Sequence, residues 1–499
     1  MNLIELSSHN ILTSFSYSSV ANITGFSLID SEGDILHTHC YAIDTLLVLQ
    51  SVKKYTDNEF FFVGGYYKDT CSTNITGKNT YPVIGRMDSL GNISSMYYYI
   101  LNGPDCSMLA GDLEVTSDRS VVTWGRNARF FVLKADSTGA PVWAKRFSGN
   151  GGFQFIKELP SGDLLAGINM GTAGAVVARM DADGDFLWCK SYIRPKGMVH
   201  DAVIESDDSF IILGVTDSTT AHAFTPLPST FQPKLFMMKL NGDGEVQWCR
   251  GYDSAPNHWH TPRASRIAKT SDGNHAVLAT LGHPGYNFFY RPFLMKADLN
   301  GDTLWTRSVG ANGYDYYTQD LLASSDGGIL FSGIVWGNLP QMWIGALYIF
   351  KTDSLGHFSC SEQVHPVQVL DLFPTDSSFV LTSVDGAVAL PAFVNDTICD
   401  PIATYDACIA TTVPDYVRAR KPRVYPNPNT GRFTVEFPDP LMAESYYSVY
   451  DALGRLLYQR PLPTGSTVEE VDLSRFGRGT YMIRFTSPDG VQHERVVLE

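Results

Sequence analysis

The sequence has few charged residues and no long hydrophobic run. Charged residues make up 18% of the 499 residues, against 44% hydrophobic and 12% aromatic residues. This composition favours β-strands over long charged helices. No apolar stretch approaches the roughly 18 residues that a membrane-spanning helix needs, and the strongest, such as residues 60–63, have the length of a strand. We therefore expect an all-β protein without a transmembrane segment, long enough for two or three domains of about 150 residues.

Basic residues and closely spaced cysteines are also scarce. Residues 415–499 contain 11 basic and 11 acidic residues, so the formal net charge of −15 lies entirely on residues 1–414, which hold 26 basic and 41 acidic residues. An acidic body repels phosphate, which argues against nucleic acid as a partner. The eight cysteines form no C-x-x-C pair, so the usual zinc and thioredoxin spacings are absent. Their even number leaves disulfides open, with buried free thiols as the alternative.

One turn pattern, an Asp or Asn followed after two residues by Gly, recurs seven times. Successive glycines lie 58, 48, 45, 60, 57 and 55 residues apart, at Gly33, Gly91, Gly139, Gly184, Gly244, Gly301 and Gly356. A basic residue stands five positions before the glycine in six copies, and a Trp stands four positions after it in four copies: Trp143, Trp188, Trp248 and Trp305. This spacing is typical of propeller blades.

Each repeat is interpreted as four antiparallel strands. Alternating apolar residues lead into the Asp/Gly turn, and a second polar turn, such as residues 117–119, precedes each of these hairpins. The sequence therefore predicts a seven-bladed β-propeller over residues 1–362. Residues 363–414 contain further strand-like pieces and a linker; these strands either seal the ring or form an extra partial blade. We expect the repeated Trp to pack between blades and the periodic Lys and Asp to form a solvated ladder of charges.

The longer connections of each blade are the predicted ligand-binding face. Both tight turns of a four-stranded blade lie on one face, so the longer connections lie on the other. These are residues 66–81, 215–234, 251–263, 281–292, 308–318 and 334–345, and they carry many aromatic residues. We predict that this face binds a protein or glycan; the alternative is that the rings only cover blade edges. The candidate residues are Trp259, Tyr286, Tyr290, Tyr314, Tyr316, Tyr317, Trp336 and Trp343.

Residue patterns for catalysis or metal binding are weak. His37 and His39, like His258 and His260, share one strand face, but the spacing fixes no third ligand. The segments 181–185 and 241–245 superficially resemble calcium loops, yet they coincide with the hairpin turns that already explain their Asp and Gly residues. Residues 133–143 resemble the tryptophan-bearing repeat of quinoprotein propellers, without the adjacent cysteines of those enzymes. We expect no catalytic residue, no metal and no cofactor, with calcium as the weakly supported exception.

The last part of the chain has a different character. After a basic linker with proline at residues 415–423, short alternating strands and four turns over residues 424–499 predict a small immunoglobulin-like β-sandwich. Three motif blocks occur there in order: VYPNP with its following glycine, VYDALGR, and GTY leading into MIRF. They contain Tyr425, Pro426, Asn427, Pro428, Gly431, Asp451, Gly454, Gly479 and Tyr481.

These blocks resemble the C-terminal sorting domain of type IX secretion cargo from Bacteroidetes. The resemblance implies that the type IX secretion machinery recognises this domain, moves the protein to the cell surface or the medium, and removes the tail, here within about residues 409–423. Such cargo needs a signal peptide, but the N-terminus MNLIELSSHN has no basic or apolar segment of that kind. We expect a truncated or misassigned start.

Together these features predict an exported, non-catalytic propeller that binds an extracellular protein or glycan. A secreted carbohydrate-active hydrolase or lyase on the same scaffold is the alternative, and a purely structural surface component is a third interpretation.

Overall fold

The computed structural model describes residues 2–17, 23–41, 47–68, 79–102, 108–127, 130–149, 151–171, 174–192, 197–206, 208–216, 234–254, 258–259, 265–282, 290–310, 314–339, 342–358, 362–392, 396–397, 422–437, 445–451, 455–487 and 490–499. These residues form β-strands and no helix. They belong to two compact units, Met1–Thr411 and Thr412–Glu499. None of the described segments is a helix that could reach across a bilayer.

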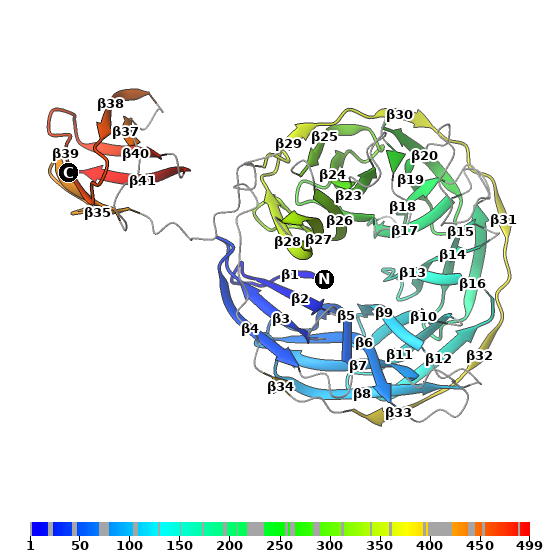
Figure 1. The fold of residues 1–499 in the computed structure, drawn as a ribbon. Coiled ribbons are helices and arrows are strands. Elements are labelled where there is room, and N and C mark those ends of the chain that lie inside the picture. The colour runs from blue at the N-terminus through cyan, green and yellow to red at the C-terminus, as the bar shows by residue number, and fades with distance from the viewer. Residues whose placement is uncertain are drawn as a thin grey trace. The chain divides into compact units, whose positions relative to one another are not determined.

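Seven antiparallel sheets stand around a central axis in the first unit (Figure 1). Blade 1 contains β1 (Leu3–Glu5), β2 (Ile11–Tyr17), β3 (Ile23–Ile29) and β4 (Ile35–Tyr41). Blade 2 contains β5 (Leu47–Lys54), β6 (Glu59–Lys68), β7 (Asn79–Asp88) and β8 (Ile93–Leu101). Blade 3 contains β9 (Met108–Val115), β10 (Val121–Asn127), β11 (Phe130–Ala135) and β12 (Pro141–Phe147). Blade 4 contains β13 (Gly151–Glu158), β14 (Leu164–Met170), β15 (Gly174–Met180) and β16 (Phe186–Tyr192).

The remaining three blades complete the ring. Blade 5 contains β17 (Gly197–Ile204), β18 (Phe210–Thr216), β19 (Leu235–Leu240) and β20 (Val246–Asp253). Blade 6 contains β23 (His275–Gly282), β24 (Tyr290–Ala297), β25 (Thr303–Val309), and β21 (His258–Trp259) and β22 (Arg266–Lys269), which both pair with β23. Blade 7 consists of β26 (Tyr314–Ala323), β27 (Ile329–Leu339) and β28 (Met342–Thr352). The expected seven-bladed propeller is confirmed.

In blades 1 to 6 the repeated Asp-x-x-Gly turn connects the last two strands of the blade, whereas in blade 7 it follows β28, and the described residues form three strands there instead of the predicted four. In blade 3 one carboxylate oxygen of Asp136 accepts hydrogen bonds from the backbone N–H groups of Thr138 (2.8 Å) and Ala140 (3.0 Å). Gly139 has a φ of 89°, a left-handed conformation that glycine adopts without a steric cost. Each turn is therefore fixed by its own residues, which explains why the sequence repeat predicts the hairpins.

The repeated Trp packs against the next blade, as predicted. The indole of Trp188 in blade 4 lies against Gly244 of blade 5, where a Cβ atom would come within 2.8 Å of the ring, and its N–H donates to the carbonyl of Gly242 (3.0 Å). Trp143 contacts Gly184 in the same way, and its N–H donates to the carbonyl of Ala182 (2.8 Å). Glycine is required at the turn because a side chain would displace the indole.

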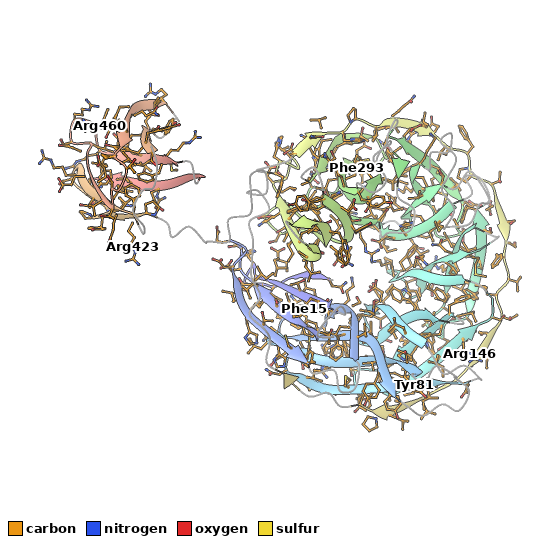
Figure 2. The ribbon with its side chains drawn as sticks, in the orientation of Figure 1. Phe15, Tyr81, Arg146, Phe293, Arg423 and Arg460 are labelled. Carbon is orange, nitrogen blue, oxygen red and sulfur yellow. The ribbon has the colours of Figure 1, made fainter. Side chains whose placement is uncertain are left out.

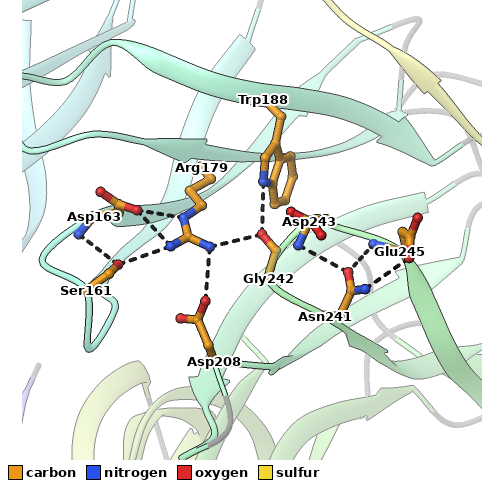
Figure 3. Close-up of polar contacts among 9 residues, drawn as sticks. All are labelled: Ser161, Asp163, Arg179, Trp188, Asp208, Asn241, Gly242, Asp243 and Glu245. Carbon is orange, nitrogen blue, oxygen red and sulfur yellow. Dashed lines mark hydrogen bonds and ion pairs between the residues drawn. The ribbon is translucent and has the colours of Figure 1, made fainter.

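The basic residue before the turn has a different partner from the one the charge ladder predicted. Lys134 forms an ion pair with Asp118 (2.8 Å), and Lys296 forms one with Asp272 (2.7 Å). Both acids belong to the other tight turn of the same blade, so each pair joins two turns within one blade. Arg179 also crosses to the next blade: it contacts Asp163 of its own blade (2.8 Å) and Asp208 (3.1 Å) of blade 5 (Figure 3).

Most of the core lies between adjacent blades, where side chains from both sheets meet (Figure 2). One such cluster combines Val177 of blade 4 with Ile212 and Phe236 of blade 5, all at most 2% exposed. Every blade therefore depends on its neighbours for burial of its apolar faces.

The segment after blade 7 returns around the outside of the propeller and is here called the belt (residues 362–397; Figure 1). Its strands are β29 (Glu362–Val364), β30 (Gln368–Asp371), β31 (Asp376–Ser378), β32 (Ser383–Asp385), β33 (Ala387–Pro391) and β34 (Asp396–Thr397). They pair in turn with the outer strands of blades 6, 5, 4, 3, 2 and 1. The described part of this segment neither seals the ring nor forms an extra blade, the two arrangements that the sequence left open.

Ion pairs accompany the belt along four blades. Each joins a belt acid to a basic residue six positions after a turn glycine: Glu362 with Arg307 (2.8 Å), Asp376 with Lys190 (3.6 Å), Asp385 with Lys145 (3.8 Å), and Asp371 with Arg250. The belt thereby covers the outer strands, whose free backbone groups would otherwise be open to pairing with other chains.

Blades 1 and 7 close the ring through a buried apolar cluster of Leu3, Ile11 and Leu330 and through polar contacts. The backbone N–H of Leu3 donates to the carboxylate of Asp320 (2.8 Å), and Glu5 accepts a hydrogen bond from the backbone N–H of Ser325 (2.8 Å). Strands β1 to β4 of blade 1 come from the N-terminal segment, and β34 of the belt adds to their outer edge. Among the described residues, the ring therefore closes through contacts between blades 1 and 7.

Cysteines occur in both states that the sequence left open. Cys40 is disulfide-bonded, whereas Cys189 and Cys249 are free and buried. Burial raises the pKa of both free thiols to about 12.

The second unit is a small two-sheet sandwich, as predicted. One sheet contains β35 (Arg423–Tyr425), β36 (Arg432–Glu436) and β39 (Val468–Asp472), and the other contains β38 (Leu456–Leu462), β37 (Ser445–Tyr450), β40 (Gly479–Ser487) and β41 (Gly490–Leu498). Their inner faces meet in one core in which Val435, Val449 and Ile483 have no exposed surface.

Candidate functional site

The predicted aromatic residues lie mostly in strands rather than in loops. Tyr290 begins β24, Tyr314, Tyr316 and Tyr317 lie in β26, and Trp336 lies in β27. The loop assignment was wrong here because β26 and β27, with ten and eleven residues, extend further than a typical blade strand. Tyr286 lies outside the described residues. The backbones of Trp259 and Trp343 lie in β21 and β28, and their side chains are outside the described part.

Exposure separates these residues. Trp336 is 39% exposed, and Tyr290, Tyr314 and Tyr317 are half-buried. Tyr316 is only 5% exposed, because its ring packs against Tyr348 (5.5 Å between ring centroids) in the core between blades 6 and 7. Its expected exposure is corrected: Tyr316 is a core residue.

Blades 6 and 7 bring several of these groups together around Asp315. The ring centroids of Tyr290 and Tyr317 are 5.1 Å apart, and the backbone N–H of Tyr290 donates to the carboxylate of Asp315 (3.0 Å). Asp315 is 4% exposed, and burial raises its pKa above the ordinary value. Trp336 is its register partner across the sheet. We call Tyr290, Asp315, Tyr317 and Trp336 the blade 6/7 cluster; Tyr314 instead lies beside Tyr316, with 6.4 Å between the ring centroids.

A second polar group lies on the inner strands at the propeller axis. It consists of Lys53, Asp112, Glu114, Lys157, Asp201, Arg266 and Asp320, which come from blades 2 to 7. Lys157 lies 3.7 Å from Asp201, and Arg266 lies 3.9 Å from Asp320. Irregularities in strand pairing fall directly before Asp112, Asp201 and Asp320. Such bulges re-aim side chains, and here they recur at the same level of the inner strands.

The axis carboxylates hold neighbouring blades together. Asp201 of blade 5 accepts a hydrogen bond from the backbone N–H of Ile267 in blade 6 (3.2 Å), and Asp320 of blade 7 accepts one from Leu3 of blade 1. Sequence reasoning missed this group because its members come from six blades and share no local motif.

Charges set the pKa values of the axis group. Burial opposes ionisation of Asp112, but Lys53 and Arg266 outweigh it and hold the pKa of this carboxyl below its ordinary value. Burial raises the pKa of Glu114 above its ordinary value, although Lys157 and Lys53 act in the opposite direction. The two acids stand two positions apart on β9. Because burial and the surrounding charges act on them differently, Glu114 binds a proton more tightly than Asp112 does.

The residues of the calcium-like segments are used by the turns. The carboxylate of Asp181 accepts the N–H groups of Asp183 (3.0 Å) and Asp185 (2.9 Å), and the side-chain oxygen of Asn241 accepts that of Glu245 (2.8 Å). No group of three or more His, Cys, Asp or Glu side chains in the described part of the chain is arranged to hold a metal ion.

The sorting motifs lie together in the second unit. The side chain of Asn427 donates to the carbonyl of Arg495 (2.7 Å) and accepts the N–H of Val497 (2.9 Å), so the YPNP segment is fixed against β41. Tyr425 is 47% exposed. The carboxylate of Asp451 accepts the N–H of Arg455 (2.9 Å).

Gly431 of the first block and Tyr481 of the third block each take part in a short hydrogen bond within the second unit. Gly431 has a φ of 108°, and its carbonyl accepts the N–H of Leu473 (2.6 Å). The hydroxyl of Tyr481 donates to the carbonyl of Gly477 (2.6 Å), close to Gly479. Pro426 and Pro428 both follow cis peptide bonds. Gly454 lies outside the described residues.

The second unit also matches a known family. The model of the secretion system C-terminal sorting domain matches residues 423–499. The chain therefore carries a type IX sorting domain at its C-terminus, interacts with the type IX secretion machinery, and is exported to the cell surface or the extracellular space. No curated protein matches the chain.

Solved structures similar to this chain include three with low identity. A protein of unknown function from Bacteroides caccae is 11% identical, with 70% of this chain and 92% of that chain covered and a TM-score of 0.32. A GH32 β-fructofuranosidase variant from Bombyx mori in complex with sucrose is 9% identical over 77% and 90% of the two chains, with a TM-score of 0.28. An engineered GH43 glycoside hydrolase is 8% identical over 80% and 97%, with a TM-score of 0.26. These scores carry no argument about activity.

Proposed function

We propose that the propeller is an exported binding module that holds an extracellular protein or glycan at the blade 6/7 cluster. The observation that carries this proposal is the grouping of Tyr290, Tyr317 and the exposed Trp336 around the buried carboxyl of Asp315. Aromatic rings supply rigid apolar contact area, and a fixed polar group orients the bound partner. The proposal needs no cofactor or metal.

The elements under the cluster favour a preorganised site. The backbone of β26 pairs with β27 along its whole described length, and Tyr316 anchors the same strand in the core. Residues presented by paired strands lose little conformational entropy when a ligand binds. The net charge of −15 on residues 1–414 further favours neutral or basic partners over polyanions.

The test is a glycan and peptide array probed with the purified full chain, with product analysis for every hit. Trp336→Ala should weaken binding by about tenfold or more, because an exposed aromatic anchor at an interface contributes about 1–3 kcal/mol. Leu347→Ala is the matched control, since Leu347 is 43% exposed on the neighbouring strand β28. Equal binding by the Trp336 variant and the intact chain would refute this location.

A hydrolase or lyase acting on glycans is the second candidate, favoured by one observation at the axis. The pKa of Glu114 is raised, whereas the pKa of the nearby Asp112 is lowered. Such a difference is typical of a pair in which one carboxyl is the general acid and the other stays ionised. If array ligands are consumed and Glu114→Gln abolishes turnover while binding persists, the protein is an enzyme. Intact ligands after long incubation support the binding module.

A further inference from the structure

A cavity of about 290 Å³ lies between the outer strand of blade 3 and the belt, far along the chain from the blade 6/7 cluster. Pro141, Trp143 and Lys145 of β12 line one side, and Asp385, Gly386 and Ala387 of the belt line the other. Its volume is close to the lower end of the range of small-molecule sites, about 300 Å³, so it has room for only a small ligand.

The belt residue beside the cavity differs from its equivalents at the neighbouring blades. At blades 5, 4 and 3 the belt residue after each strand donates its N–H to the equivalent carbonyl of the blade: Leu372 to Cys249, Phe379 to Cys189, and Gly386 to Ala144, each 2.9 Å. Leu372 and Phe379 pack against the cores beside them. At Gly386 the side chain of Asn102 occupies the place of a Cβ atom and donates to the carbonyl of Asp385 (2.8 Å), so no belt side chain packs against the blade at this position.

The groups at the cavity suit a neutral, hydroxyl-rich ligand. The indole of Trp143 is a half-buried apolar surface held in place by its N–H bond to Ala182. The side chain of Lys145 is 9% exposed and lies 2.7 Å from Asp185 and 3.8 Å from Asp385. The side chain of Asp385 is 69% exposed and can accept hydrogen bonds from a ligand.

The local charge argues against anionic ligands. One ammonium group faces two carboxylates, which leaves the site with a formal charge of −1 on a unit that is itself acidic. A phosphate or a uronic acid would be repelled, whereas the ring of a neutral sugar offers an apolar face to Trp143 and hydroxyl groups to Asp385.

We propose that this cavity, the rim pocket, binds one neutral saccharide unit, with Trp143 as the stacking surface and Asp385 as the acceptor for its hydroxyl groups. The rim pocket is independent of the blade 6/7 cluster. A protein with both sites attaches to a glycan at its rim while the blade 6/7 cluster holds another partner.

The experiment is ligand-observed NMR with the full chain and methyl glycosides of glucose, galactose, mannose, fucose and N-acetylglucosamine, with methyl glucuronide as the anionic probe. We expect at least one neutral glycoside to bind with a Kd of about 1–10 mM, as single sugar rings with few contacts do, and the glucuronide not to bind. Binding of the glucuronide alone, or of no glycoside at all, would overturn the proposal.

The chain offers matched controls at blade 5. Asp371 pairs with Arg250 as Asp385 pairs with Lys145, and Trp248 corresponds to Trp143, but Leu372 stands where blade 3 has Gly386. Asp385→Asn should raise Kd at least about fivefold, and Asp371→Asn should leave it within about twofold. Trp143→Ala should abolish binding and Trp248→Ala should not. If the variants at the two blades behave alike, the pocket is not the site, and Asp385→Asn keeps this test valid should the Trp variants fail to fold.

Discussion

At the residue scale, hydroxyl groups of buried tyrosines join one blade to the next. Tyr192 donates to the carbonyl of Gly244 (2.6 Å), and Tyr99 and Tyr252 make the same bond to Gly139 and Gly301. These residues stand eight positions after a turn glycine, a signal that is present in the sequence but was not among the predicted features. Blade 3 has Phe147 at this position and blade 6 has Val309, so these two blades lack the hydroxyl group.

Tyr192→Phe should therefore lower the free energy of unfolding of the propeller by about 1 kcal/mol, the usual contribution of one hydrogen bond. Urea denaturation followed by circular dichroism measures the loss. Tyr446→Phe, at a ring that is 38% exposed in the second unit, should change nothing in this transition. A loss of several kcal/mol for Tyr192→Phe would mean that the hydroxyl group does more than join two blades.

The free thiols give a second prediction at this scale. Cys189 and Cys249 are buried and have pKa values of about 12, so thiolate is scarce at neutral pH. In the native protein both should resist iodoacetamide at pH 8, and both should react in urea. Peptide mass spectrometry of each site distinguishes them from the other cysteines. Rapid native labelling of either would show that its blade opens locally.

At the scale of single elements, the ion pairs between the two tight turns of a blade predict a loss of stability in acid. Burial opposes ionisation of Asp118 and Asp272, but Lys134 and Lys296 outweigh it and hold the pKa values of these carboxyls below the ordinary range. In the unfolded chain these carboxyls have a pKa of about 4, so they take up protons at a higher pH than the folded carboxyls do. The contribution of the ion pairs to the free energy of unfolding is therefore present above about pH 4 and declines as the pH falls below it.

The measurement is the urea midpoint of the propeller between about pH 5 and pH 2.5. The Asp118→Asn/Asp272→Asn variant should show a smaller decrease over this range than the unchanged chain. Asp183→Asn is the control, because Asp183 forms no ion pair among the described contacts. An identical decrease in all three proteins would assign acid sensitivity to other carboxyls.

The elements also show where sequence reasoning succeeds. The Asp-x-x-Gly hairpins could be predicted because each turn is fixed by hydrogen bonds within five residues, as at Asp136. The belt could not, because its strands are two to five residues long and exposed, and the partners of Asp376 and Asp385 lie more than a hundred residues away. The aromatic positions were identified, but their burial was not: whether Tyr316 faces solvent depends on Tyr348 in another strand.

The belt itself depends on its first ion pair. Arg307 and Glu362 lie 2.8 Å apart with side chains 13% and 18% exposed, where the belt leaves blade 7 and reaches blade 6. Glu362→Gln should loosen this end, and limited proteolysis should cut residues 362–371 several times faster while the blades remain folded. Lys54→Met, which removes a pair with two exposed partners, is the control. Equal cleavage in both variants would show that backbone pairing alone holds the belt.

At the scale of the whole molecule, the ring closes between blades 1 and 7 through a small apolar cluster and a few polar contacts. Asp320→Asn weakens the bond to the N–H of Leu3 and removes one of the three carboxylates that act on Arg266. Faster amide hydrogen exchange should then appear first in β1 and β26, because opening at this junction needs no other blade to separate. Exchange that rises equally in all blades would indicate that the ring opens elsewhere.

The sorting domain matches the second unit, whereas the proposed binding lies in the propeller, and this separation can be tested by truncation. The sandwich has its own core of Val435, Val449 and Ile483, and the propeller closes without it. A chain that ends at residue 411 should keep the unfolding midpoint of the propeller within about 1 °C, since no core residue is lost. The same chain should remain inside cells that possess a type IX system, because the matched sorting domain is missing.

The reciprocal fusion separates the two roles. Residues 412–499 attached to an unrelated secreted reporter should direct it to the surface, and Asn427→Ala in this fusion should reduce export because the YPNP segment loses its hydrogen bonds to Arg495 and Val497. Fractionation of cells and medium measures the export of both the truncated chain and the fusion. Export of the truncated propeller at the normal level would contradict the assignment of the sorting signal to the sandwich, whereas loss of ligand binding on truncation would mean that the tail takes part in recognition.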